Sequence, residues 1–338
     1  MWLTIIFVDM NIYFDNAAAM PPDPRCGEWL AEILRLGPVN QESTHAFGRR
    51  TRELLAESES RLLAALCPSW KGGRVIFAPS GSDALNVLPY SYKWNKGRAR
   101  FSDFEHPAAR RAAERAGGEL AVYTHVQSEL GLFCVPENGK LVVCDTIQSA
   151  GKLELPSLPD ILTVSGHKLG APGGAALLVN PACKLELDFD APRHRDYLVG
   201  RPEPVQIMLM VRALEEAVRN REENLDAVSA LNRFLRDNLP RGVMTTLPFE
   251  QASPYILHLR ILGRQGAIVA RMLSNRGIMT SPSSACQAEA GGPSAALTAL
   301  GLRGKEAYEG LRLSFSPLNT MAEAEIFLRI LTEELTNY

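Results

Sequence analysis

The feature of this 338-residue sequence that most constrains its fold is a series of short apolar runs in the first half of the chain. Several of these runs are continuously apolar rather than alternating, which is typical of strands covered on both faces of a sheet. The runs predicted as strands are Val75–Ala78, Ala99–Ser102, Leu120–Tyr123, Leu141–Cys144, Ile161–Val164 and Ala175–Val179.

Helical patterns separate several of these strands. Leucines at three-to-four spacing predict two helices between residues 25 and 67, with a polar turn at Val39–His45. Further helices are predicted at Asp83–Tyr90 and Ala108–Ala116, after the first two strands. This alternation predicts an α/β fold with a largely parallel sheet.

The second half of the chain predicts a smaller α+β part. A helical stretch at Val205–Asp237 leads into it, and it contains predicted strands at 254–261, 277–281 and 311–315 and helices at 265–275, 294–300 and 321–335. Because 338 residues are long for one core, we expect a large domain (14–240), a small domain (1–13 and 241–338) and a deep cleft.

Composition excludes several functional classes. The formal net charge is -2, with 46% hydrophobic and 22% charged residues and no long basic run, so nucleic acid is not an expected partner. The apolar start, Met1–Val8, is too short to span a bilayer and lacks the basic flank of a signal peptide. We interpret it as a strand, or as a leader before a start at Met10, and expect no membrane partner.

The six cysteines are scattered without CxxC spacing, which predicts neither a zinc site nor a disulfide framework. This usage favours a reducing compartment, the cytoplasm.

Two predicted strands end in residues that carry chemistry. The strand from Ile161 leads into Ser165-Gly-His-Lys168, and the strand from Leu141 ends at Asp145. The carboxyl ends of parallel strands face the ligand crevice of such folds. Alone, Lys168 is typical of a solvated turn and Asp145 of a helix cap. Together they match pyridoxal phosphate, which needs a lysine for its aldehyde and a carboxylate at its ring nitrogen.

Two further segments fit the same cofactor. Phe77–Asp83 passes from strand to helix and places the Gly81 and Ser82 amides where a phosphate would bind, although a simple helix cap fits equally well. His106 follows another predicted strand, where an imidazole could stack on a flat ring or serve only a structural role.

With these residues the chain resembles the class V aminotransferase group, and specifically the cysteine desulfurases of the NifS type. The resemblance runs nearly end to end and implies the pyridoxal-phosphate-dependent transferase fold type I, the fold of aspartate aminotransferase. It is carried by Tyr13–Ala19, Ser43–Arg49, Ser80–Asp83, Glu105–His106, Asp145, Gln148–Gly151, Ser165–Lys168, Ser283–Ala288, Pro293–Ser294 and Ala299–Leu302.

The resemblance implies a role for each matching residue. Lys168 would be the Schiff-base lysine, Asp145 would pair with the ring nitrogen, Gln148 would contact the ring hydroxyl and His106 would stack on the ring. The phosphate would be bound by Ser82, Ser165 and His167, together with the Gly81 amide.

The C-terminal half carries the feature that separates desulfurases from other class V enzymes. Cys286 lies in a loop rich in serine, alanine and glycine, which suits a nucleophile that swings between substrate and an outside acceptor. Arg312 resembles the family's arginine that grips the substrate carboxylate. Asn16, Ala17 and Ser128 complete the expected substrate site. The resemblance implies conversion of L-cysteine to L-alanine, a sulfur-acceptor protein and a homodimer.

Three departures from the family pattern stand out. Only nine residues separate Gly131 from Leu141, so either the crossover there is abbreviated or the flanking strands are not neighbours. Ser128 replaces a usual asparagine. Arg201 lies where the family has a threonine that reaches the partner subunit's phosphate, so either it makes a charged contact instead or it is a surface arginine.

The alternatives are a selenocysteine lyase, another class V aminotransferase and a non-catalytic scaffold for sulfur assembly. A scaffold has no need of Lys168, Asp145, His106, Cys286 and Arg312 together, which favours an enzyme.

Overall fold

The computed structural model describes residues 11–90, 97–136, 139–155, 157–183, 203–283 and 292–337. These residues form two compact units. The larger comprises Ala19–Gln127 and Cys134–Glu222, and the smaller comprises the residues before Ala19, Ser128–Phe133 and the chain from Glu223 onward. The domains expected from the sequence, 14–240 and 1–13 with 241–338, stay a prediction.

A five-stranded sheet forms the centre of the larger unit, in the order β2-β6-β5-β4-β3. Strands β3, β4 and β5 are parallel to one another, and β6 runs antiparallel to both of its neighbours, β2 and β5. The sheet is therefore mostly parallel with one reversed strand. Its strands are β2 (Arg74–Ala78), β3 (Leu120–Thr124), β4 (Leu141–Asp145), β5 (Ile161–Ser165) and β6 (Ala175–Val179).

The predicted strand at Ala99–Ser102 is wrong. Only Arg100 pairs with the sheet: its N–H donates to Leu120 O over 2.8 Å, and its carbonyl accepts from Val122 N over 2.9 Å. A charged residue interrupts this short apolar run, and one bridge does not make a strand.

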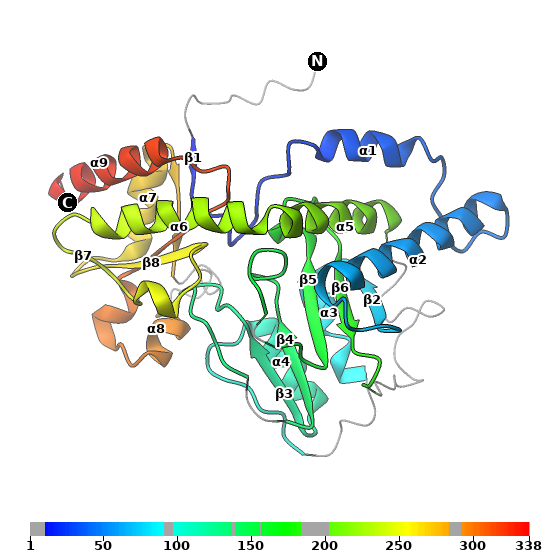
Figure 1. Cartoon of the computed structure of the whole chain (residues 1–338). Coiled ribbons are helices and arrows are strands. Elements are labelled where there is room, and N and C mark those ends of the chain that lie inside the picture. Colours follow the sequence, from blue (N-terminus) through cyan, green and yellow to red (C-terminus); the bar gives the residue numbers. More distant parts are fainter. Residues whose placement is uncertain are drawn as a thin grey trace. The chain divides into compact units, whose positions relative to one another are not determined.

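Helices cover both faces of this sheet (Figure 1). Alternate residues of β6 explain how: Leu177 packs in the core with α3 and α4, and Leu178 packs in the core with α1, α2 and α5. The continuously apolar strands are therefore buried on both faces of the sheet, as the sequence predicted. The helices of this unit are α1 (Cys26–Leu34), α2 (Ala46–Leu66), α3 (Gly81–Leu85), the 3₁₀ turn η1 (Leu88–Tyr90), α4 (Pro107–Ala116), η3 (Gly166–Lys168) and α5 (Pro204–Arg219).

Two predicted helices are each divided in two. The helix expected at Asp83–Tyr90 is α3 followed by η1, because Pro89 has no N–H to continue the ladder. The stretch Val205–Asp237 is α5 and α6 (Arg221–Asp237), which meet at Asn220.

The smaller unit contains an antiparallel sheet in the order β10-β11-β8-β7, and β1 pairs separately with β9 in parallel. The predicted strand at 277–281 is two short strands on either side of Thr280. The strand β7 was not predicted from the sequence. The elements are β1 (Ile12–Tyr13), β7 (Val243–Thr245), η4 (Phe249–Gln251), β8 (Ile256–Ile261), α7 (Gly266–Asn275), β9 (Ile278–Met279), β10 (Ser281–Pro282), α8 (Ala295–Ala299), η6 (Gly304–Tyr308), β11 (Gly310–Ser314) and α9 (Met321–Asn337).

The connection between β3 and β4 is abbreviated, and the two strands are neighbours. Its described residues contain no helix. Instead, Ser128–Phe133 belongs to the smaller unit, where Gly131 O accepts from Ser253 N over 2.8 Å and Phe133 N donates to Gln251 O over 3.0 Å. Of the two alternatives left open by the sequence, the first is confirmed.

In the described part of the chain, no helix combines the length and the apolar character needed to cross a membrane. The apolar start at Met1–Val8 lies outside the described residues.

Candidate active site

The predicted cofactor residues of the larger unit gather at one edge of its sheet. Strand register fixes this arrangement, because Asp145 at the end of β4 lies opposite Thr163 of β5. At the same edge, Ala175 of β6 lies between Ser165 of β5 and Ala78 of β2. The residues that follow these strands are therefore brought to one place, as expected at the carboxyl ends of parallel strands.

Asp145 is buried and held by two hydrogen bonds. Thr163 Oγ1 and the Ile147 N–H each donate to its Oδ1 over 3.0 Å. Among the residues that the structure describes, no hydrogen bond reaches Oδ2. This second oxygen is thus left to accept from a protonated ring nitrogen.

His106 caps the N-terminus of α4, and its Nδ1 accepts from the Ala108 N–H over 3.1 Å. This contact assigns the ring proton of the neutral form to Nε2. Burial lowers the pKa of His106; the Asp145 charge opposes this shift, and the Lys168 and Arg111 charges add to it. A neutral imidazole with one N–H to donate is the form suited to stacking on a cofactor ring.

Lys168 ends η3, the single 3₁₀ turn that follows β5. In the same turn, Ser165 Oγ lies 2.8 Å from His167 Nδ1. The pKa of His167 is lowered to about 4, mainly by burial and then by the charges of Lys168 and Lys152. Near neutral pH His167 therefore acts as a neutral hydrogen-bonding group.

The turn between β2 and α3 contains a helix cap, one of the two alternatives left open by the sequence, while phosphate binding there stays a prediction. The helix is capped by Ser80, whose Oγ accepts from Asp83 N over 3.2 Å and donates to Asp83 Oδ2 over 2.7 Å. A Cβ at Gly81 would lie 2.3 Å from Ile147 Cδ1 and 3.6 Å from Ser165 Cβ. Glycine therefore lets this turn approach Ile147, which follows β4, with the exposed Ser82 next to it.

The turn after β4 buries several polar residues, among them Gln148 and Lys152. Lys152 follows Gly151, which has a φ of 73°, and its N–H donates to Ser149 O over 2.9 Å. Burial, helped by the charge of Lys168, lowers the Lys152 pKa from 10.5 to about 7. A second lysine thus lies near the predicted cofactor lysine.

We expect Lys152→Met to raise the free energy of unfolding of the cofactor-free protein at pH 7 by about 2 kcal/mol, because burying the ammonium opposes folding. The unfolded chain binds more protons than the folded chain between pH 7 and 10.5, so wild-type stability rises across this window. The advantage of the variant should shrink accordingly. Urea unfolding at several pH values checks this, with the exposed Lys71→Met as control. A gain that stays constant with pH would contradict it.

The predicted carboxylate-binding arginine lies in the smaller unit, on β11. Arg312 Nη1 donates to Ser128 O over 2.8 Å and Nη2 donates to Asp15 Oδ1 over 2.6 Å. Its buried Nε has no hydrogen-bond partner in the described part of the chain. Arg312 is therefore fixed in place and retains donor capacity for a carboxylate. Ser128 contributes its carbonyl to this arrangement.

Asn16 and Ala17 pack against the same strand. Asn16 Nδ2 donates to Ser314 O over 2.8 Å, and the Ala17 N–H donates to Ser314 Oγ over 2.8 Å. The buried Asn16 Oδ1 has no partner among the described residues. Both residues therefore hold the chain next to Asp15.

Two predicted site residues, Cys286 and Arg201, lie outside the described residues, and their roles stay predictions. No role was predicted from the sequence for Thr163, Glu129 or His258. The role of Thr163 follows from strand register, which a single sequence does not supply. Glu129 and His258 contact each other across 129 positions, so no local pattern marks them.

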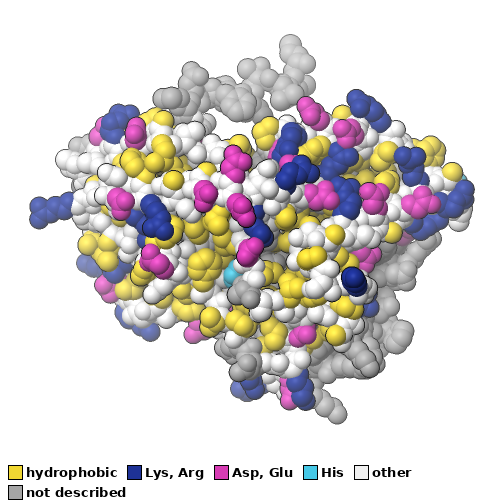
Figure 2. Space-filling view, in the orientation of Figure 1, with side chains coloured by type: hydrophobic (Ala, Val, Ile, Leu, Met, Phe, Trp, Pro, Cys, Tyr) yellow, Lys and Arg dark blue, Asp and Glu magenta, His cyan; other side chains and the backbone are white. Residues whose placement is uncertain are grey.

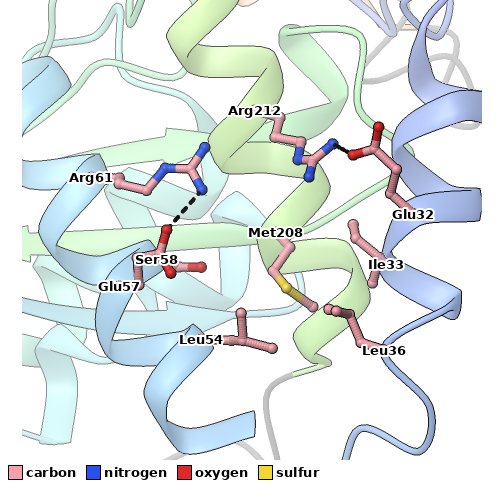
Figure 3. Close-up of a pocket in the computed structure, with 9 residues that line it drawn as sticks. All are labelled: Glu32, Ile33, Leu36, Leu54, Glu57, Ser58, Arg61, Met208 and Arg212. Carbon is pink, nitrogen blue, oxygen red and sulfur yellow. Dashed lines mark hydrogen bonds and ion pairs between the residues drawn. The ribbon is translucent and has the colours of Figure 1, made fainter. Parts of the chain in front are cut away.

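A cavity of about 280 Å³ lies elsewhere in the larger unit, between α1, α2 and α5 (Figure 3). Its charged residues pair with one another: Arg212 with Glu32, and Arg61 with Glu57 and Glu215. Charges of both signs are interspersed over these helices (Figure 2). The cavity contains none of the predicted site residues.

Comparison with known proteins gives the relationships of the chain. No protein-family model matches it. It is 26% identical over 382 aligned positions to an IscS-like cysteine desulfurase of Mycobacterium tuberculosis, with 94% of this chain and 95% of the relative covered. A cysteine desulfurase IscS of Vibrio campbellii is 28% identical, with 94% and 90% covered. The chain is similar along nearly its whole length to IscS-type cysteine desulfurases.

Solved structures identify the fold of this chain. The NifS-like protein of Rickettsia africae superposes with a TM-score of 0.82 at 20% identity, over 97% of this chain and all of that one. An apo cysteine desulfurase of Thermococcus onnurineus gives 0.76 at 18% identity, over 97% and 95%. The fold is that of NifS-like proteins, as expected for fold type I.

Proposed function

We propose that this chain is a pyridoxal-phosphate-dependent cysteine desulfurase, which converts L-cysteine to L-alanine and leaves the sulfur on Cys286. The observation that carries the proposal is the placement of Lys168 and Asp145 after neighbouring parallel strands. The similarity to IscS-type enzymes supports a cofactor-binding role for this pair.

The residues at this edge of the sheet fit the cofactor. Asp145 Oδ2 is left for the ring nitrogen, and α3 begins at Gly81 and Ser82, whose main-chain amides are suited to a phosphate. The bound cofactor supplies an electron sink for bonds at the substrate α-carbon. The proposed holding residues are Lys168, Asp145, Gln148, His106, Gly81, Ser82, Ser165, His167 and Arg201.

Each remaining residue has a defined task in this proposal. The Lys168 amine takes the proton from the substrate α-carbon and returns it. His106, neutral with its proton on Nε2, donates a hydrogen bond at the ring face. Arg312 grips the substrate carboxylate, which is a positioning contribution. Asp15 and the Ser128 carbonyl keep the guanidinium oriented.

Cys286 is the proposed sulfur acceptor. Its thiolate attacks the sulfur of bound L-cysteine, so that an S–S bond forms and the substrate C–S bond breaks. The electron pair stays with the substrate carbon, which takes a proton and gives L-alanine. Burial raises the pKa of Cys26, Cys67, Cys134 and Cys144, to about 12 for Cys67 and Cys134, so these described thiols are poor nucleophiles at neutral pH.

The wider setting follows from the same proposal. The persulfide on Cys286 passes to a sulfur-acceptor protein, for iron–sulfur cluster assembly or for thiolation. A homodimer, in which Arg201 reaches the partner's cofactor phosphate, completes the enzyme in the cytoplasm.

The direct test is turnover by the purified protein. With pyridoxal phosphate, L-cysteine and dithiothreitol, we expect equal amounts of L-alanine and sulfide and a cofactor colour that survives dialysis. L-selenocysteine in a parallel reaction distinguishes a selenocysteine lyase. A protein that takes up no cofactor and forms no L-alanine would refute the proposal.

A further inference from the structure

Ser283, which directly precedes the segment 284–291, and Ser294, three residues after its end, are both described, although the segment itself, which contains Cys286, is not. Ser283 follows β10, and its N–H donates to Gly310 O over 3.2 Å. Ser294 caps α8, and its N–H donates to Ala307 O over 3.0 Å. Both flanks are therefore held by their main chain to one short stretch, residues 307–310.

One carboxylate joins the side chains of these flanks. Ser294 Oγ donates to Glu129 Oε1, and Ser283 Oγ is a further hydrogen-bond partner of Glu129. Glu129 follows Ser128, whose carbonyl is held by Arg312 over 2.8 Å. The carboxylate thus lies beside the predicted substrate arginine and contacts both flanks of the cysteine segment.

The buried His258 of β8 holds the Ser283 side chain that contacts Glu129. Its side chain is fully buried, with Nδ1 2.6 Å from Thr246 Oγ1 and Nε2 hydrogen-bonded to Ser283 Oγ. Burial, with the charges of Arg312 and Arg260, lowers the His258 pKa to about 3, so the ring is neutral. With the proton on Nε2, it donates to Ser283 Oγ, which leaves the Ser283 hydroxyl proton for Glu129.

Gly310 makes this close packing possible. A Cβ at this position would lie 1.8 Å from Ser283 Oγ and 2.8 Å from His258 Nε2. Any side chain there would displace the serine from the histidine. The network therefore depends on side chains from four separate segments of the smaller unit, together with a glycine.

We propose that Glu129 is a positioning residue for Cys286, which acts by tying Ser283 and Ser294 together and so fixing both ends of the segment that carries the cysteine. Its importance for sulfur transfer rests on the proposed function, but the anchoring itself does not. The same segment orients Arg312 through Ser128, so one structural element serves both the substrate carboxylate and the sulfur acceptor.

Charge strengthens this anchor. Burial raises the Glu129 pKa to about 7, while hydrogen bonds from Ser294 and Ser283 and the Arg312 charge oppose the shift. The titratable or charged groups that face Glu129 include His258 on β8 and Arg312 on β11. As the pH rises through 7, Glu129 ionises and its bonds to the two hydroxyls become stronger.

The test uses the full-length chain with pyridoxal phosphate added. In Glu129→Ala we expect amide hydrogen exchange at Ser283 and Ser294 to be about tenfold faster than in wild type, the effect of losing a hydrogen bond to a charged group. Alkylation of Cys286 by iodoacetamide, followed by peptide mass spectrometry, should also be faster. Unchanged rates at all three positions would overturn the proposal.

The isosteric Glu129→Gln separates anchoring from general loss of structure. It keeps an acceptor oxygen, so at about pH 6 we expect exchange rates close to wild type, whereas at about pH 8 only the ionised wild type gains protection. A ratio between the two proteins that does not change with pH would overturn the role of the charge. Glu325→Gln, on an exposed position of α9, is the matched control and should leave both rates unchanged.

A second variant, Ser283→Ala, removes one of the two ties and should speed exchange at Ser283 more than at Ser294. Equal effects at both amides would point to general loosening and contradict the proposal. These measurements do not depend on turnover. If wild type formed no L-alanine, the proposed function would fail, but the exchange rates at Ser283 and Ser294 would still test the anchoring.

Discussion

Lys168→Ala is expected to reduce L-alanine formation from L-cysteine by at least about 1,000-fold, because alanine offers no amine to bind the cofactor aldehyde or to move the α-proton. The Lys168 charge contributes to lowering the pKa of His106, His167 and Lys152, so the amine lies among the groups that would surround the cofactor. Borohydride treatment should attach the cofactor covalently to the peptide containing Lys168 in wild type.

The matched control for this variant is Lys71→Ala, which changes an exposed lysine in a turn and should retain full activity. If borohydride attached the cofactor to Lys152 instead, or if Lys168→Ala retained turnover, the assignment of the cofactor lysine would be wrong.

Cys286→Ala is expected to lower sulfide release by about 100-fold or more while the protein keeps its cofactor colour and binds L-cysteine. The reason is chemical, since the substrate sulfur then has no protein thiolate to accept it. Mass spectrometry of wild type after one turnover should find the added sulfur on the peptide containing Cys286. Cofactor absorbance and L-alanine assays complete the measurement.

Cys26→Ala and Cys134→Ala serve as controls, because burial raises the pKa of both thiols. Both variants should release sulfide at close to the wild-type rate. Undiminished turnover in Cys286→Ala would instead favour a class V enzyme that does not use a protein persulfide.

The α/β architecture was predictable because burial on two faces leaves a strong signal. The runs that became β2, β3, β4, β5 and β6 are apolar on both sides of the strand. Strand direction leaves no such signal, so the reversal of β6 could not be read from the sequence. The run at Ala99–Ser102 shows the opposite error, because apolar residues alone do not ensure pairing beyond Arg100.

The candidate site was predictable where residues lie at or shortly after the end of a strand, as Asp145 and Lys168 do. The helix cap shows the limit of this reasoning: the hydroxyl that caps α3 belongs to Ser80, which had no assigned role. The contacts of Glu129 with Ser294 and His258 bring together residues more than 120 positions apart. Such pairs become visible only when the sheet of the smaller unit is formed.

The order of the smaller unit along the chain has a consequence for synthesis. Ile12 near its start pairs with Ile278, and the carbonyl of Phe14 accepts from Ser314 N. The larger unit can assemble its sheet once β6 has left the ribosome, but the first strand of the smaller unit must wait for β9 and β11. Until then its apolar residues, including Phe14, have no core to join. The nascent chain therefore exposes an apolar N-terminal segment throughout most of translation, and we expect chaperones to bind it.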